Sequence, residues 1–252
     1  MNKFVTILGI SISIAPLGYS LNPTILTLVL CFIISLACTS IGFWLDKKLK
    51  VKNNSFLNKL YYHFSRKDSQ YDFDTVESTY VCLENNEYKC RRIFVLKPRT
   101  NDLQAMESRY RWSASSKQAK IIPYDVKHKI KNLRQECDWN CYTIDFGKIC
   151  TKGEKFTTGA TIENLSDPNN EALPFFSHAV TRKTKLLKMT VEFPEGKQPK
   201  GDVTFSVMAY GRKIENNPVE EVLKYDPRIG GYSKTINYPR IGWTYIISWK
   251  ND

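Results

Sequence analysis

The chain has 252 residues, and its 37 Lys and Arg against 25 Asp and Glu give a formal net charge of +12. This length accommodates one ordinary domain with an added segment, or two small domains. The seven cysteines are an odd number without an obvious pairing scheme, which argues against a secreted disulfide framework and favours a reducing cytosol. The charge is unevenly placed, because no Asp, Glu, Lys or Arg stands between Phe4 and Leu45 and only Lys3 precedes them.

Two apolar runs fill this uncharged stretch, Phe4–Tyr19 and Pro23–Leu45. A bilayer core requires roughly twenty apolar residues in helical form, because lipid offers no partner for backbone polar groups. The residues between the runs have turn chemistry, with Pro23 placed to begin a helix. Residues 1–46 are therefore predicted to form a transmembrane hairpin. A signal peptide is the rival interpretation, but a second apolar run follows at once, and a lipoprotein-like site at Cys38 lies deep within it.

Four lysines follow the second run: Lys47, Lys48, Lys50 and Lys52. Lys and Arg are enriched on the cytoplasmic side of membrane helices, so both ends of the chain are predicted to lie in the cytoplasm. Residues 47–71 are interpreted as a basic juxtamembrane connector. Anionic lipid beside this segment is one explanation of the basic charge.

Small and weakly polar residues recur at helical spacing in both apolar runs, notably Gly9 and Ser13 in the first and Ser35, Thr39 and Gly42 in the second. Helical periodicity gathers each set on one face. Close helix–helix packing is the favoured interpretation, because small residues let backbones approach. The lining of an oligomeric pore is the alternative, and it implies a homo-oligomer.

Residues 72–252 are predicted to form one mainly β cytoplasmic domain, a sandwich or a barrel-like fold. Short β-type segments follow one another, many at intervals of roughly ten residues. In the last segment Trp243, Tyr245, Ile247 and Trp249 alternate with smaller residues, which predicts a buried face. The expected strands are Thr75–Leu83, Tyr88–Leu96, Glu107–Ser113, Ala119–Val126, Cys141–Phe146, Phe156–Ile162, Lys185–Phe193, Val203–Tyr210 and Gly242–Trp249.

The sequence contains no motif that predicts an enzyme or a cofactor. Phosphate-binding loops, nucleophile elbows and zinc-protease signatures are all missing. Cys137 and Cys141 form a C-x-x-x-C pair without a second pair, which disfavours zinc. No catalytic residue, metal or cofactor is predicted. A hydrolase or redox enzyme remains a third possibility only if His, Cys and carboxylate groups converge in space.

Basic residues interleaved with aromatic ones are the candidate binding groups. Such patterns suit single-stranded nucleic acid or a nucleotide, through charge neutralisation and stacking. A solvated face opposite acidic lipid is the favoured alternative for any single cluster. The candidate ligand-binding or nucleic-acid-binding residues are Arg91, Arg92, Arg109, Arg111, Trp112, Lys129 and Lys131.

The two-helix hairpin over Phe4–Leu45, followed by a β-rich domain without an enzyme motif, resembles the small transmembrane effectors of bacterial antiphage systems of the cyclic-nucleotide or retron type. The resemblance is one of architecture. It implies a toxin-like effector in the bacterial inner membrane, whose β domain senses a nucleotide second messenger, a nucleic acid or a partner protein of the same operon. The hairpin would then disrupt the membrane. The alternative is a membrane-tethered binding or scaffold module without pore activity.

Overall fold

The computed structural model describes residues 70–114, 119–169, 171–209, 212–213 and 221–250. The predicted hairpin, with Gly9, Ser13, Ser35, Thr39 and Gly42, lies outside these residues, as do residues 47–69 of the predicted connector. Tyr71, the last residue of that connector, instead begins the first strand. Within the part of the chain that is described, no helix has the length and apolar character needed to cross a bilayer.

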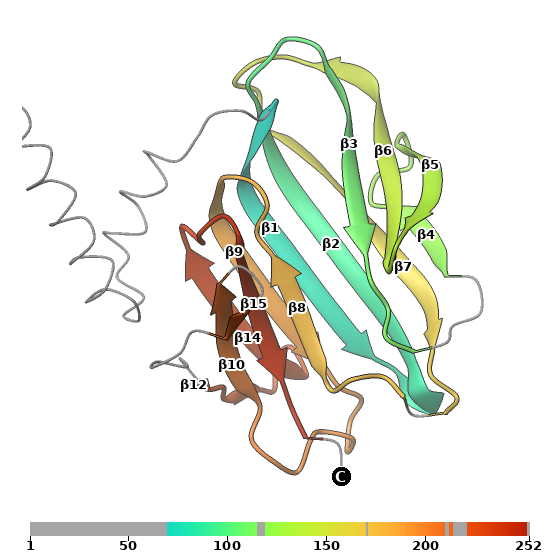
Figure 1. The fold of residues 1–252 in the computed structure, drawn as a ribbon, viewed down its shortest axis with the longest axis vertical. Coiled ribbons are helices and arrows are strands. Elements are labelled where there is room, and N and C mark those ends of the chain that lie inside the picture. The colour runs from blue at the N-terminus through green and yellow to red at the C-terminus, as the bar shows by residue number, and fades with distance from the viewer. Residues whose placement is uncertain (1–69, 115–118, 170, 210–211, 214–220, 251–252) are drawn as a thin grey trace, which may run out of the picture. The chain divides into compact units, whose positions relative to one another are not determined.

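The described residues are mainly β and form three sheets (Figure 1). A single short 3-10 helix, η2 (Glu84–Asn86), is described among them. The strands are β1 (Tyr71–Cys82), β2 (Glu87–Pro98), β3 (Leu103–Tyr110), β4 (Lys120–Pro123), β5 (Lys129–Glu136), β6 (Trp139–Cys150), β7 (Phe156–Ser166), β8 (Phe175–Ala179), β9 (Thr184–Glu192), β10 (Thr204–Ala209), β11 (Arg212–Lys213), β12 (Glu221–Val222), β13 (Tyr225–Asp226), β14 (Gly231–Asn237) and β15 (Trp243–Ser248).

The largest sheet has seven strands in the order β13-β14-β9-β1-β2-β7-β4, and we call it the main sheet. At its centre β1 pairs antiparallel with β2 and parallel with β9. The β1–β2 connection is tight because Asn85 adopts a left-handed conformation with φ 59°, which Asn tolerates better than most residues. One face of the main sheet is the core face, where Val76, Leu187 and Met189 are fully buried.

Two smaller sheets pack on that same face of the main sheet. β11-β10-β15-β8, with β12 beside β10, lies over one part of it, and β3-β6-β5 lies over another (Figure 1). Tyr80 of β1 stacks on Phe176 of β8 at 5.5 Å, and Phe156 of β7 contacts Phe146 of β6 at 4.7 Å. Aromatic pairs at these separations add to the burial of apolar area. The edge strands β8 and β3 therefore lie above the central strands of the main sheet, and they frame the site described below.

The mainly β prediction is confirmed, and each of the nine expected strands overlaps a strand of the structure. The strands expected at Thr75–Leu83 and Tyr88–Leu96 pair antiparallel as β1 and β2. The predicted buried face of β15 is also confirmed, since Tyr245 is 4% and Ile247 0% exposed. Pattern analysis missed β5, β8 and β14, and also the two-residue strands β11, β12 and β13.

Candidate anion-binding groove

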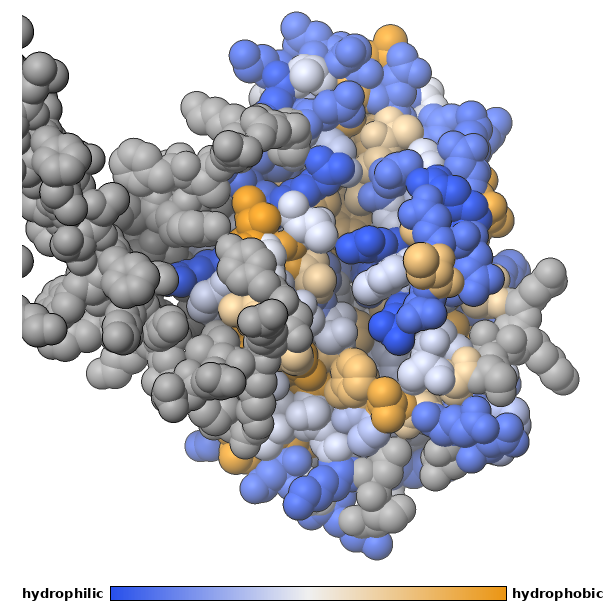
Figure 2. Space-filling view, viewed as in Figure 1, coloured by the Kyte–Doolittle hydropathy of each residue, from blue (hydrophilic) through white to orange (hydrophobic). Residues whose placement is uncertain are grey.

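A groove of about 740 Å³ lies between β3 and β8, above β1 and β2 (Figure 2). Ligand sites in proteins typically have volumes of about 300–1,000 Å³. Five arginines line the groove, against two glutamates, Glu107 and Glu136. We call this site the arginine groove, after its lining residues Arg92, Arg109, Arg111, Arg134 and Arg182.

Arg92 rises from β2 into the base of the groove. Its register partner on β1 is Ser78, so both lie on the core face of the main sheet. The guanidinium Nη1 of Arg92 donates a 2.6 Å hydrogen bond to the carbonyl oxygen of Arg109. No carboxylate among the described residues lies within ion-pair distance of Arg92. A partly buried cation without a counter-ion favours a nearby anion, because its charge is only weakly screened there.

Two more arginines of the groove rest on aromatic rings. The guanidinium carbon of Arg109 lies 4.4 Å from the centroid of Trp139, and that of Arg182 lies 4.3 Å from the centroid of Tyr71. Cation–π contacts orient a guanidinium without neutralising it. Within the described part of the chain, neither arginine has a carboxylate partner. Both therefore bring a positive charge to the groove lining without an ion pair among the described residues.

The remaining two arginines are paired with carboxylates. Arg134 donates to Glu136 at 2.6 Å and to Glu107 at 3.2 Å, and Arg111 lies 3.1 Å from Asp138. The hydrogen bond from Arg134 holds the pKa of Glu136 below its ordinary value. These exposed pairs are screened by water and contribute little stability. The arginines of the groove that lack an ion pair among the described residues are therefore Arg92, Arg109 and Arg182.

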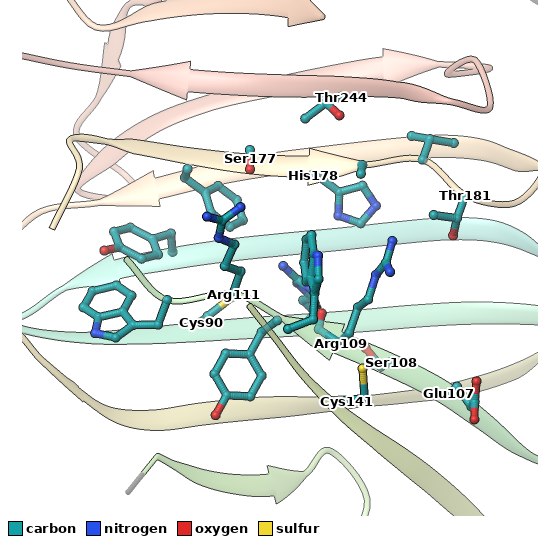
Figure 3. Close-up of a pocket in the computed structure, with 18 of the residues that line it drawn as sticks. Cys90, Glu107, Ser108, Arg109, Arg111, Cys141, Ser177, His178, Thr181 and Thr244 are labelled. Atoms are coloured by element: carbon teal, nitrogen blue, oxygen red, sulfur yellow. Dashed lines mark hydrogen bonds between the residues drawn. The ribbon is translucent and has the colours of Figure 1, made fainter. Parts of the chain in front are cut away.

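His178 lies on the β8 wall of the groove, opposite Arg109 on β3 (Figure 3). Its Nδ1 is 3.0 Å from Oγ of Ser78 on β1. Burial, with a smaller contribution from the positive charge of Arg92, lowers the pKa of His178 from 6.5 to about 3. The imidazole is therefore neutral at physiological pH. It brings a hydrogen-bonding group, not a charge, to the lining of the groove.

The structure brings together four of the seven candidate residues, and these are Arg92, Arg109, Arg111 and Trp112. Trp112 packs against Tyr80 and Tyr88 at one end of the groove, at centroid distances of 6.4 and 5.1 Å. Its indole Nε1 is buried and has no hydrogen-bond partner among the described residues. The interleaved Arg-aromatic pattern after residue 108 therefore identified one wall of the groove.

The other three candidates do not line the groove. Arg91 alternates with Arg92 along β2 and points to the opposite face of the main sheet, where it is exposed. Lys129 and Lys131 lie on β5, and Lys131 forms an ion pair with Asp145 at 2.5 Å. That ammonium group lowers the pKa of Asp145. These two lysines are solvated surface groups of an edge strand.

Sequence reasoning missed three important groups of the groove, namely Arg134, His178 and Arg182. Arg134 ends one basic run of the sequence, 127–134, and Arg182 begins another, 182–188. Spacing along the chain does not connect the two runs. His178 had no Cys or His neighbour at a metal-ligand spacing. The one usable signal was the alternation in β8, which places Phe176 and His178 on the same face.

Five free cysteines are described, and none forms a disulfide with another. Cys137 is exposed at the turn between β5 and β6, and the thiol of Cys141 donates to Glu136 at 3.6 Å. In the described ranges, no three His, Cys, Asp or Glu side chains are grouped so as to hold a metal ion. The C-x-x-x-C pair thus has no third ligand among these residues.

Comparison with known proteins gives no family assignment. No protein-family model and no curated protein matches the sequence. Among solved structures, the chain is similar to a "putative protease" from Parabacteroides distasonis, with 11% identity and a TM-score of 0.44. The match covers 72% of this chain and 40% of the other, so this chain spans less than half of that protein. A likeness of this size carries no argument about activity.

Proposed function

We propose that this protein is a membrane-tethered β-sandwich binding module whose arginine groove takes up an anionic partner. One observation carries the proposal: Arg92, Arg109 and Arg182 converge on one groove from three separate chain segments, without carboxylate partners in the described part of the chain. Structural arginines are usually paired with carboxylates when they are partly buried. A ligand with negative charge would compensate these three.

The membrane part of the proposal rests on the sequence. Residues 1–46 are proposed to anchor the domain in the bacterial inner membrane as two helices, with both chain ends in the cytoplasm. The groove would then face cytoplasmic partners. A second candidate function builds on the same anchor. Its motive is the pairing of the small-residue faces around Ser13 and Ser35 with a large basic domain. In such an effector, ligand binding would rearrange oligomerised hairpins and breach the membrane.

The test of the binding function uses full-length protein in detergent micelles and two charge-matched double variants. One removes groove charges (R92Q with R109Q), and the other removes the charges of Lys129 and Lys131 (K129Q with K131Q). Poly-glutamate and pyrophosphate serve as anionic probes, with binding followed by titration calorimetry at low salt. We expect the groove variant to lose binding and the β5 variant to retain it. Equal loss in both variants would show only general attraction to a basic protein.

The effector candidate has a separate test. The hairpin is replaced by an unrelated two-helix anchor, and membrane potential is followed in cells that express the protein with its genomic neighbours. If the hairpin is only a tether, the protein keeps its function after the replacement. If the protein is an effector, the replacement abolishes its effect on the membrane potential. Unchanged polarisation in every activated state of the native protein would eliminate the effector candidate and leave the binding module.

A further inference from the structure

The arginine groove is bounded by two sheet edges that face each other. β8 ends the order β11-β10-β15-β8, and β3 ends the order β3-β6-β5. A strand at the end of a sheet presents N–H and C=O groups that can pair with another chain. Both edges lie above the same central strands (Figure 1). Residues of β8 and β3 line the groove, so an added strand could pair with either edge.

The hydrogen bonds of β8 show which of its residues face the groove. Val180 donates to the carbonyl of Trp243 at 2.8 Å and accepts from Gly242 at 2.8 Å, and Pro174 accepts from Trp249 at 3.0 Å. The main-chain groups of successive residues in a strand point alternately to its two sides. Residues 174, 176, 178 and 180 thus face β15, and Ser177 and Ala179 direct their N–H and C=O groups to the opposite side, into the groove.

Among the described residues, these main-chain groups are without a backbone partner. Neither Ser177 nor Ala179 has a backbone hydrogen bond on the groove side among the described residues, and both line the groove. On the opposite wall the carbonyl of Arg109 already accepts from Arg92. The β8 edge is therefore the more open of the two, and it is five residues long. A segment of that length spans about 17 Å when extended.

The inward side chains of a strand added beside β8 would contact the core face of β2. Along β2 the core face presents Phe94, Arg92 and Cys90 in turn, and Phe94 and Cys90 are buried hydrophobic residues. The inward positions of the added strand would thus contact an apolar site, a guanidinium and an apolar site. Arg109 and Arg182 line the same groove and add positive charge around the added strand. Charge complementarity selects carboxylates, with one acidic residue between two apolar ones on the inward face.

We propose that the arginine groove binds an extended acidic segment of a partner protein as an added β-strand on the β8 edge. Main-chain pairing with Ser177 and Ala179 supplies affinity that does not depend on sequence, and Arg92 selects an acidic side chain. This inference rests on the proposed anion-binding function and names its ligand. It differs from a small phosphate-bearing ligand because it requires the backbone of the ligand.

The experiment measures fluorescence polarisation of a labelled peptide that alternates valine, serine and glutamate, so that one glutamate lies between two valines on the same face. Full-length protein is compared with A179P and A179V. Proline removes the groove-facing N–H of Ala179 without touching the ladder to β15, and proline is tolerated on edge strands. Valine adds similar bulk and keeps the N–H. We expect binding to weaken at least about tenfold in A179P, and to stay within about threefold of native in A179V.

Two further measurements keep the test decisive if A179P does not fold. A peptide methylated at alternate backbone nitrogens should fail to bind native protein. A glutamine version of the peptide should bind R92Q and native protein equally, whereas the glutamate peptide should lose affinity in R92Q. Equal binding of the methylated and normal peptides would overturn strand addition. If pyrophosphate binds through Arg92 and no peptide binds, this inference fails and the groove function stands; if neither binds, both fail.

Discussion

The guanidinium of Arg92 donates a 2.6 Å hydrogen bond to the main-chain oxygen of Arg109, across the space between two sheets. A side chain of the main sheet thereby satisfies the exposed edge of another sheet. The contact also holds two cations close together, with no carboxylate between them among the described residues. Arg92 thus has both a structural role and, in our proposal, a ligand-binding role.

The structural role of Arg92 is tested by Arg92→Met, which keeps the aliphatic stem and removes the donor. We expect a loss of about 1–2 kcal/mol in the free energy of unfolding, because the Arg109 carbonyl loses its partner. Arg91→Met is the control, since Arg91 is exposed on the opposite face; we expect a change below about 0.5 kcal/mol. Urea titration followed by tryptophan fluorescence measures both. Equal losses in the two variants would contradict the structural role.

His178 should make the stability of the domain depend on pH. The unfolded imidazole takes up a proton near its ordinary pKa of 6.5, whereas the folded one does so only at about 3. Between these values the unfolded state binds more protons, so stability falls as the pH drops through this window. The slope contributed by His178 is at most about 1.4 kcal/mol per pH unit.

His178→Asn removes this titration and retains a polar partner for Ser78. We expect a shallower loss of stability between pH 6.5 and pH 4 in the variant, measured by denaturant titration at each pH, and parallel curves above pH 7. The pKa of His128, which burial also lowers, keeps its own contribution in both proteins. Identical slopes in native protein and variant would show that His178 does not titrate differently on unfolding.

Gly159 lies where β7 passes close to β2. A Cβ atom there would stand 2.1 Å from the carbonyl oxygen of Arg92, so the strands would have to separate. Gly159→Ala should cost about 3 kcal/mol in the free energy of unfolding, through backbone shifts in the main sheet. Gly201→Ala is the matched control, because the nearest atom to its Cβ would be 3.8 Å away. Thermal unfolding of both variants measures the difference in stability. A Gly159→Ala protein as stable as Gly201→Ala would contradict this packing.

Alkylation should separate the described cysteines by burial. Cys137 is exposed, whereas Cys90 and Cys150 are buried, and burial raises the pKa of Cys82 to about 12. A thiol reacts as its thiolate, so N-ethylmaleimide at neutral pH should modify Cys137 first. Peptide mass mapping at successive times measures the order. Faster modification of Cys90 than of Cys137 would mean that the β1–β2 pair opens readily.

Strands with strong apolar alternation could be predicted from the sequence, as Tyr245 and Ile247 of β15 illustrate. β5 could not, because nearly all its side chains are exposed, as expected of a sheet edge that faces water. Only part of the groove lining could be predicted from the sequence. Arg109 and Trp112 lie on one segment, but their nearness to Arg182 depends on how three sheets stack, and no local pattern encodes that stacking. The opposite directions of Arg91 and Arg92 were implied by strand alternation alone.

The parallel pairing of β1 with β9 determines when the domain can assemble during synthesis. β1 ends at Cys82 and its parallel neighbour runs from Thr184 to Glu192, so about a hundred residues must leave the ribosome before the centre of the main sheet closes. Until then the β1–β2 pair has a hydrophobic, unpaired flank. Nascent chains of this protein should therefore require chaperone protection over that interval, and truncation before β9 should yield an aggregating fragment and not a smaller domain.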